Sequence, residues 1–499
     1  MKLDKSFNKK EIVVFNRVIP IEVIILIIIM LFGIYLRLGF LEVPPFWIDE
    51  SISSMASLNI LEKGVPLLDS GLYYGRALVF HYSQAVSILF FGSNDFAARL
   101  PSVFFGLLTV LLAYLVGKEY SKEKYAGLVC ALLMSVFFLE VFFSKQARFY
   151  QLFQLAFFAS LFFLYKSRKD SKWLIPALLS FLIAVDTQPA GLVLVPFFVL
   201  HILFFNLKKW FYSLVPIITF ILEQTSFFSV TASTTLGESY VTQITAKYAL
   251  LYFSFTTNMR FMLLFFIPGA IWAFFKNKIL TTLLIVPAII VLSGVLFLEV
   301  FAFRYAYLVT FPLIIFSSLF LVFLIEKHGK LIFIALIALV LIPSNLFYPF
   351  SYVTMLVPSS NNLNDFSAPQ INFKDIPTDL LTELKSTQNP ILTHYSPPVE
   401  WYIQKPDYVM AFTMNGRGDD QISYDNNGIL VDEYSGAKMI YSFDSIPLGK
   451  YYYIEQGFAF MKLKGEQRTL ASLLKENCLV RYRNNDLGIF ECNKVFSIK

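Results

Sequence analysis

Asp49 and Glu50 form an adjacent pair of carboxylates in the stretch FWIDES, which follows one of the most apolar runs of the chain. Charged side chains near a membrane are costly and by default indicate function. A carboxylate is the group that a general base requires, because it can accept the proton of an attacking hydroxyl. The competing interpretation is that the pair only keeps a loop in water.

Three arginines provide the complementary charge. Arg76, Arg148 and Arg304 are predicted to lie on the same side of the membrane as the carboxylates. The planar guanidinium suits a phosphate because it donates two parallel hydrogen bonds, although an arginine at a helix end also commonly reaches a lipid headgroup. The combination predicts an enzyme that handles a lipid-linked phosphate. Weaker substrate-binding candidates, which could equally be membrane anchors or belt aromatics, are Lys145, Tyr150 and Tyr305.

The composition indicates which kinds of domain carry these charged side chains. Of the 499 residues, 57% are hydrophobic and only 15% are charged, whereas soluble proteins have roughly 45–50% apolar and about 25% charged residues. The long apolar runs are confined to residues 1–350. We therefore predict a transmembrane domain over 1–350, whose first outer loop (41–96) carries the catalytic pair, and a soluble domain over 351–499.

The apolar runs predict a polytopic α-helical protein, because a spanning helix needs about 20 largely apolar residues. The eleven predicted spans are 18–40, 97–117, 126–143, 150–165, 173–187, 190–205, 211–229, 260–275, 280–298, 306–325 and 331–349. The run 77–91 is placed in the membrane interface instead of across it.

The lysine and arginine distribution predicts the orientation. With 77–91 in the interface, each inner loop has at least two lysines or arginines, whereas the outer connections at 144–148, 186–190 and 299–305 have two, none and one. Cytoplasmic loops carry the excess of these residues. We therefore expect a cytoplasmic N-terminus, with the active site and the C-terminal domain extracytoplasmic.

The C-terminal segment alternates between helix-like and strand-like stretches, which predicts an α/β domain. The expected helices are 378–387 and 469–477, and the expected strands are ILTHY, DYVMAF, KMIYSF and YYYIEQ. LVRYRNNDLGIFEC predicts a hairpin that turns near residue 485 and places Cys478 opposite Cys492. Directly opposed strand residues can come within disulfide range, so we predict this bond. GRGDD (416–420) is interpreted as a solvated turn.

Four motifs in order resemble a known family: PPFWIDES, FFGSNDFAARLPSVFFGLLTVLLAYLVGKEYS, SKQARFYQLF and, more weakly, FRYAYLVTFP. The chain resembles the C-type (GT-C) membrane glycosyltransferases of the protein O-mannosyltransferase and lipid A aminoarabinose transferase group. The resemblance covers roughly residues 15–350 and is strongest from 44 to 160.

The resemblance implies an inverting transfer of a sugar from a polyprenyl-phosphate donor to an acceptor hydroxyl. Asp49 matches the family's general base, and Glu50 is expected to orient the acceptor or the base. Arg76, sixteen residues before Gly92, matches a basic residue that contacts phosphate. Gly75 stands where close relatives have a glutamate that can bind a metal. No cofactor is certain, and the nearby candidates for a divalent metal are Asp49, Glu50 and His81.

Two other functions are consistent with some of these charged residues. A transporter or flippase of lipid-linked sugars would also place arginines near lipid phosphate, but the sequence has no internal repeat of the kind common in transporters. A non-catalytic scaffold of the cell envelope would make Asp49 dispensable. The expected partners are the bilayer, a polyprenyl-phosphate sugar and a lipid, glycan or protein acceptor, with no nucleic acid.

Overall fold

The computed structural model describes residues 11–14, 17–121, 125–231, 260–295, 303–328, 354–359, 371–410, 422–424, 428–440, 445, 449–457, 465–476 and 478–494. The predicted span 331–349, most of the outer loop near 230–258 and the GRGDD segment lie outside these residues. The chain divides into two compact units. We call Met1–Leu41 with Arg99–Ser360 the membrane unit, and Glu42–Ala98 with Asn361–Lys499 the loop–tail unit.

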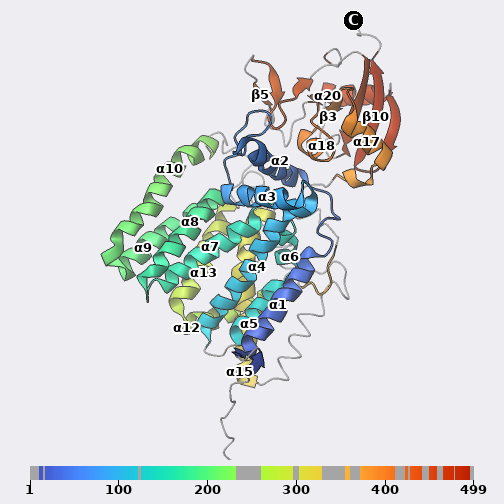
Figure 1. Ribbon diagram of the computed structural model, residues 1–499. Helices are drawn as coiled ribbons and strands as arrows, with labels where there is room; N and C mark the ends of the chain where they lie inside the picture. Colours follow the sequence, from blue (N-terminus) through green and yellow to red (C-terminus); the bar gives the residue numbers. More distant parts are fainter. Residues whose placement is uncertain are drawn as a thin grey trace, which may run out of the picture. The chain divides into compact units, whose positions relative to one another are not determined.

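Apolar helices make up most of the described membrane unit (Figure 1), preceded by the short hairpin β1 (Glu11–Val14) and β2 (Arg17–Pro20). Between them lie the 3-10 turns η1 (Ser171–Trp173), η2 (Pro189–Leu194), η3 (Leu207–Ser213) and η4 (Tyr307–Val309). The helices are α1 (Ile21–Leu38), α4 (Asp95–Tyr120), α5 (Tyr125–Val136), α6 (Phe138–Ser144), α7 (Tyr150–Lys166), α8 (Leu174–Thr187), α9 (Val195–Phe205), α10 (Leu214–Thr231), α12 (Arg260–Lys276), α13 (Lys278–Val295), α14 (Phe303–Ala306) and α15 (Thr310–His328).

These helices coincide with the predicted spans that precede residue 331. By length and composition alone, three described segments are long and apolar enough to cross a membrane: Ile21–Leu38, Asp95–Tyr120 and Arg304–Lys327. The other apolar helices are shorter, so the number of spans and their orientation stay predictions.

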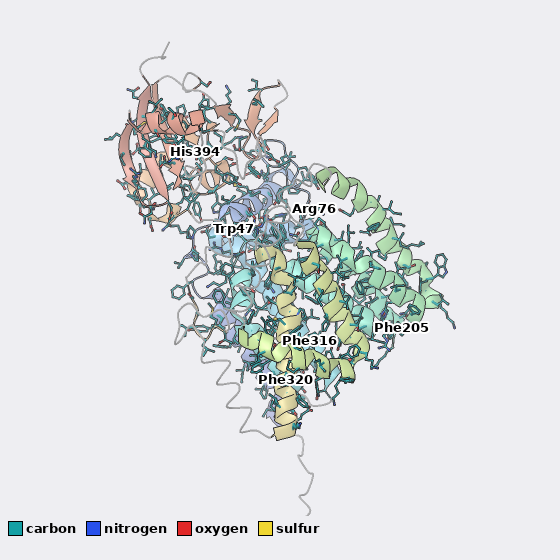
Figure 2. The ribbon with its side chains drawn as sticks, turned by 180° about the vertical axis from the view of Figure 1, so that it is seen from behind. Trp47, Arg76, Phe205, Phe316, Phe320 and His394 are labelled. Carbon is teal, nitrogen blue, oxygen red and sulfur yellow. A yellow bond between two sulfur atoms is a disulfide. The ribbon has the colours of Figure 1, made fainter. Side chains whose placement is uncertain are left out.

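Close helix packing in the membrane unit depends on small residues and aromatic rings. A Cβ added at Gly269 of α12 would lie 1.9 Å from the backbone oxygen of Phe316 on α15, so only glycine allows this approach. Phe316 and Phe320 of α15 (Figure 2) pack against rings of neighbouring helices, with Phe316 6.1 Å from Tyr120 and Phe320 5.9 Å from Phe265 between ring centroids.

The loop–tail unit combines two helices of the first loop with the C-terminal α/β residues (Figure 1). The helices and helical turns are α2 (Ile48–Lys63), α3 (Leu78–Phe91), η5 (Phe373–Asp375), α17 (Thr378–Ser386), α18 (Ser396–Tyr402) and α20 (Gly465–Glu476). The strands are β3 (Ile391–Thr393), β4 (Tyr408–Met410), β5 (Ile422–Tyr424), β6 (Leu430–Asp432), β7 (Lys438–Ile440), β8 (Gly449–Gln456), β9 (Cys478–Arg483) and β10 (Leu487–Lys494).

The strands form one mixed sheet in the order β5-β6-β7-β4-β3-β8-β10-β9. The pairs β3–β4, β3–β8 and β4–β7 are parallel, and the other pairs are antiparallel. The α/β character predicted for the C-terminal domain is confirmed. The stretch PPVEWYI between two strands forms α18, because prolines suit the first turn of a helix.

The first outer loop, which the sequence assigns to the transmembrane domain, belongs to the loop–tail unit. Ile48, Ile52 and Met55 of α2 share one hydrophobic core with residues of the sheet and of α18. The reason is that α2 has apolar side chains that the tail can cover. The helix α3, with 14 residues, is roughly 21 Å long, too short to cross a hydrocarbon core of about 30 Å.

The last two strands form the hairpin expected near residue 485. Its turn is closed by the side chain of Asn484, whose Oδ1 accepts hydrogen bonds from the backbone N–H groups of Asp486 and Leu487 at 2.8 and 2.7 Å. A register shift follows between Ile489 and Phe490, and Cys492 then pairs with Cys478. The two cysteines form a disulfide.

Candidate active site

Asp49 and Glu50 occupy the first turn of α2, where the positive end of the helix dipole favours carboxylates. Their exposure differs, because Asp49 is half-buried whereas Glu50 is only 1% exposed. Oε2 of Glu50 accepts a hydrogen bond from the backbone N–H of Trp47, the N-cap residue, at 3.3 Å. Glu50 therefore caps the helix that carries Asp49, which favours a role in orienting the base over one in contacting the acceptor.

Two tyrosines of the tail lie within the electrostatic influence of Asp49. Burial raises the pKa of Tyr395 well above its usual value, and the nearby Tyr434, Asp49 and Asp432 add to the effect. Burial likewise raises the pKa of Tyr434, with Asp49 again among the contributing charges. The two rings lie 5.9 Å apart between centroids. The surroundings of Asp49 are thus aromatic and are supplied by residues far away in the sequence.

Arg76 lies in the same unit as Trp47 (both labelled in Figure 2), at the turn before α3. The next residue, Ala77, has a φ of 55°, a left-handed conformation that residues other than glycine rarely adopt. Such conformations cluster at functional sites. This local strain marks the turn that presents Arg76.

His81 is fully buried between α2 and α3. Its Nδ1 lies 3.2 Å from Oγ of Ser57, and its ring packs edge-on against Tyr74 at 5.3 Å. With His81 in the helix packing and Glu50 in the helix cap, these residues do not fit a metal site. Within the part of the chain that the structure describes, no three His, Cys, Asp or Glu side chains gather as metal ligands would.

The remaining predicted site residues belong to the membrane unit. The guanidinium of Arg148, a buried residue, lies 4.4 Å from the ring centroid of Phe149 and 5.8 Å from that of Tyr150. The guanidinium of Arg304 similarly lies 5.1 Å from the ring centroid of Tyr305. Arginines held against ring faces in this way have restricted side chains, which suits them to bind an anion in a fixed geometry.

The ammonium of Lys145 is held by other parts of the chain. Its ammonium donates hydrogen bonds to the backbone carbonyls of Gly39 and Ser359. Burial lowers the pKa of Lys145 to about 7, with the charge of Arg99 adding to the effect. A lowered pKa reduces the charged fraction of a lysine near neutral pH, which argues against Lys145 as a main phosphate contact.

A buried polar network links the segments that carry these arginines. The carboxylate of Glu140 on α6, fully buried, accepts hydrogen bonds from the hydroxyls of Tyr307 and Thr310, both at 2.6 Å. Nε2 of Gln154 donates to it at 2.9 Å, and Nε2 of Gln151 donates at 3.4 Å. Gln151 is three residues after Arg148, and Tyr307 is three residues after Arg304. The network therefore fixes the two arginine segments against each other.

The sequence prediction missed this network. Arg37, also fully buried, completes it by donating from Nε to Oγ of Ser144 at 3.1 Å. The available signal was the presence of a carboxylate and a guanidinium inside two apolar runs, 126–143 and 18–40. Such residues are expected to pair with one another.

The predicted site residues thus fall into two groups. The carboxylates, Arg76 and His81 belong to the loop–tail unit, whereas Lys145, Arg148, Tyr150, Arg304 and Tyr305 belong to the membrane unit.

Comparisons with known proteins concern the family and the fold. Residues 75–231 match the family described as dolichyl-phosphate-mannose-protein mannosyltransferase. No curated protein sequence matched the chain. Among solved structures, ArnT from Cupriavidus metallidurans in the apo state is 12% identical, with a TM-score of 0.61 over 94% of this chain and 97% of that one.

Two further structures are similar. The same ArnT bound to undecaprenyl phosphate is 11% identical, with a TM-score of 0.59 over 94% of this chain and 97% of that one. The Archaeoglobus fulgidus oligosaccharyltransferase in complex with Zn and sulfate is 13% identical, with a TM-score of 0.53 over 94% of this chain and 73% of that one. The chain therefore has the same fold as these solved structures. The family match covers residues 75–231, which include two of the motifs that carry the resemblance described above.

Proposed function

We propose that the chain is an inverting glycosyltransferase that moves a sugar from a polyprenyl-phosphate donor to an acceptor hydroxyl on the extracytoplasmic face. The use of a lipid-linked donor is supported by the family match and by the likeness to an ArnT structure that contains undecaprenyl phosphate. The observation that carries the proposal is the placement of Asp49, a half-buried carboxylate in the first turn of a helix whose start is fixed by Glu50.

The proposed reaction is a single displacement at the anomeric carbon of the donor. The acceptor oxygen forms a bond to that carbon while Asp49 takes the hydroxyl proton, and the bond to the phosphate oxygen breaks. The phosphate leaves with the bonding electrons, and its increased negative charge is stabilised by Arg76, the residue that matches the phosphate contact in the resemblance. Arg148 and Arg304 stay predictions from the sequence for the same role. Positioning and electrostatic stabilisation of the leaving group supply most of the rate enhancement in such a mechanism.

The test replaces Asp49 with Asn, which keeps the size of the side chain and removes the base. A strain that lacks the gene is complemented with wild-type or variant protein, and its envelope glycans are compared by mass spectrometry. We expect Asp49→Asn to reduce transfer by at least about 100-fold, the usual contribution of a general base. Purified variant should still bind undecaprenyl phosphate.

Glu62→Gln is the matched control, since it neutralises an exposed carboxylate on the same helix α2. It should transfer at the wild-type rate. Transfer by purified protein in detergent separates an enzyme from a flippase, because no membrane remains to be crossed. Normal transfer by Asp49→Asn would show that this residue is not the base.

A further inference from the structure

Helix α18 of the tail contacts Asp95, the first residue of α4, and residues 95–98 of that helix belong to the loop–tail unit. Asp95, only 5% exposed, accepts hydrogen bonds from Nε1 of Trp401 at 2.9 Å and from the hydroxyl of Tyr402 at 2.8 Å. Its carboxylate also forms an ion pair with Lys374 at 2.6 Å. A buried carboxylate with three such partners is held in one position, because each partner offsets part of its desolvation cost.

The hydroxyl of Tyr402 connects this carboxylate to the approach of α2. It accepts a hydrogen bond from the backbone N–H of Phe46 at 2.7 Å while it donates to Asp95. Phe46 is fully buried and stacks on Trp401 with 5.2 Å between ring centroids. Phe46 precedes Asp49 by three residues, so its position determines where the first turn of α2 begins.

The ring of Tyr402 is itself fixed, since it stacks on Phe373 with 5.3 Å between centroids and an interplanar angle of 12°. The hydroxyl is therefore held in place by packing that does not depend on its hydrogen bonds. Removal of the hydroxyl alone leaves the ring with its apolar contacts.

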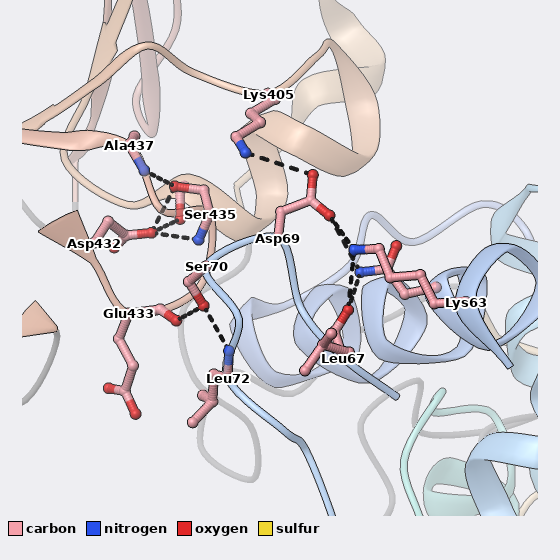
Figure 3. A network of polar contacts seen from close by, with 12 residues as sticks. Lys63, Leu67, Asp69, Ser70, Leu72, Lys405, Asp432, Glu433, Ser435 and Ala437 are labelled. Carbon is pink, nitrogen blue, oxygen red and sulfur yellow. Dashed lines mark hydrogen bonds and ion pairs between the residues drawn. The ribbon is translucent and has the colours of Figure 1, made fainter. Parts of the chain in front are cut away.

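The tail also holds the segment that follows α2 (Figure 3). Asp69 forms an ion pair with Lys405 at 3.6 Å. The backbone N–H of Ser70 donates to the carbonyl of Tyr434 at 3.3 Å, and its hydroxyl donates to the carbonyl of Glu433. Both flanks of the Asp49 helix are thus attached to C-terminal residues. Attachments at two ends restrict rotation of a helix about its axis as well as its translation.

We propose that Tyr402 and Trp401 are positioning residues for the transfer reaction: they set the orientation of Asp49 through the bridge from Phe46 N–H to Tyr402 to Asp95. This inference rests on the proposed function of Asp49 as the base. It assigns a role to the C-terminal domain, which completes the active site by fixing the helix that carries the base. Displacement of a catalytic group by about 1 Å can cost 100-fold in rate.

Tyr402→Phe tests the proposal, because it removes the bridging oxygen and keeps the ring. The donor is the lipid extract of the strain that lacks the gene, in which unused donor accumulates. Initial rates are measured against extract concentration. We expect the maximal rate to fall by about 10- to 100-fold, with the half-saturating concentration unchanged, because the donor phosphate contacts other residues.

Tyr452→Phe is the matched control, since the Tyr452 hydroxyl also donates to a carboxylate, that of Glu383, within the same unit. It should leave the maximal rate unchanged. If Tyr402→Phe fails to fold, Trp401→Phe provides the same test, because it keeps a ring against Phe46 and removes the donor to Asp95. Binding of undecaprenyl phosphate checks that each variant is intact.

The outcomes separate this proposal from the proposed function. Loss of transfer in Asp49→Asn with a normal maximal rate in Tyr402→Phe would overturn the positioning role and leave the base assignment standing. Normal transfer in Asp49→Asn would instead remove the base assignment. An equal loss in Tyr402→Phe and Tyr452→Phe would reduce the effect to general destabilisation and also overturn the proposal.

Discussion

The buried network around Glu140 allows a prediction about what stabilises the membrane unit. Glu140 receives four hydrogen bonds, from Tyr307, Thr310, Gln154 and Gln151. Hydrogen bonds between membrane helices contribute about 0.6 kcal/mol each on average, so these four sum to roughly 2.4 kcal/mol. Glu140 also acts electrostatically on the fully buried Arg37. Removal of one partner of a direct buried ion pair costs about 3–5 kcal/mol. Arg37 reaches the Glu140 segment only through Ser144, so this figure is the upper bound for the loss of either charge.

The hydrogen bonds to Glu140 and the compensation of the Arg37 charge predict different results in a double-mutant cycle. If charge compensation dominates, Glu140→Gln and Arg37→Met each lower the free energy of unfolding by more than about 2 kcal/mol and at most about 3–5 kcal/mol, and the double variant loses clearly less than the sum. If the hydrogen bonds dominate, each loss stays near 2 kcal/mol and the losses add. We expect the first result, because both side chains are fully buried.

The measurement is unfolding of the purified protein by SDS in mixed micelles, followed by circular dichroism. Ser160→Ala is the control, because Ser160 is equally buried but donates only to Phe157 within its own helix. It should cost less than about 1 kcal/mol. Additive losses in the double variant would refute the reasoning that Glu140 compensates the charge of Arg37.

Two further predictions concern the loop–tail unit. Burial raises the pKa of Glu400 from 4.5 to about 8, with the charge of Asp69 adding to the shift. The folded chain therefore keeps a proton that the unfolded chain loses, and the free energy of unfolding should fall by up to about 1.4 kcal/mol per pH unit between those values. Glu400→Gln should flatten this dependence in unfolding measured from pH 5 to 8, and an unchanged slope would exclude Glu400 as its source. Replacement of Cys478 and Cys492 by serine should lower the stability of this unit in the full chain by about 2–4 kcal/mol, measured by hydrogen exchange, and wild-type protection of the sheet would contradict it.

The elements that hydropathy and pairing rules govern could be predicted from the sequence. Apolar runs located the helices before residue 331, because a helix in lipid must be apolar over most of its length. The pairing of Cys478 with Cys492 could be predicted from their equal distance to residue 485, but the register shift between Ile489 and Phe490 that it requires could not. These features are local, so a short window of sequence contains the information.

The partners of α2 could not be predicted in this way. Ser51, Ser53, Ser54 and Ser57 are all fully buried in this helix, although serine is mostly exposed in proteins. Their environment is created by segments distant in the sequence, such as α3, where Gln84 accepts a hydrogen bond from Ser57 at 2.6 Å. A periodicity argument identifies an apolar face, but it does not identify what covers a polar one.

The interleaved connectivity of the loop–tail unit has a consequence for biosynthesis. The ribosome completes Glu42–Ala98 long before it reaches Asn361, with 262 residues (99–360) in between. At about 5–20 residues per second, this interval lasts roughly 13–50 s. During it, Ile48, Ile52 and Met55 lack the tail residues with which they share a core. Helix α2 therefore reaches its final packing only after residues 99–360 have been made, and a chain that ends before the tail lacks part of the core around the proposed base.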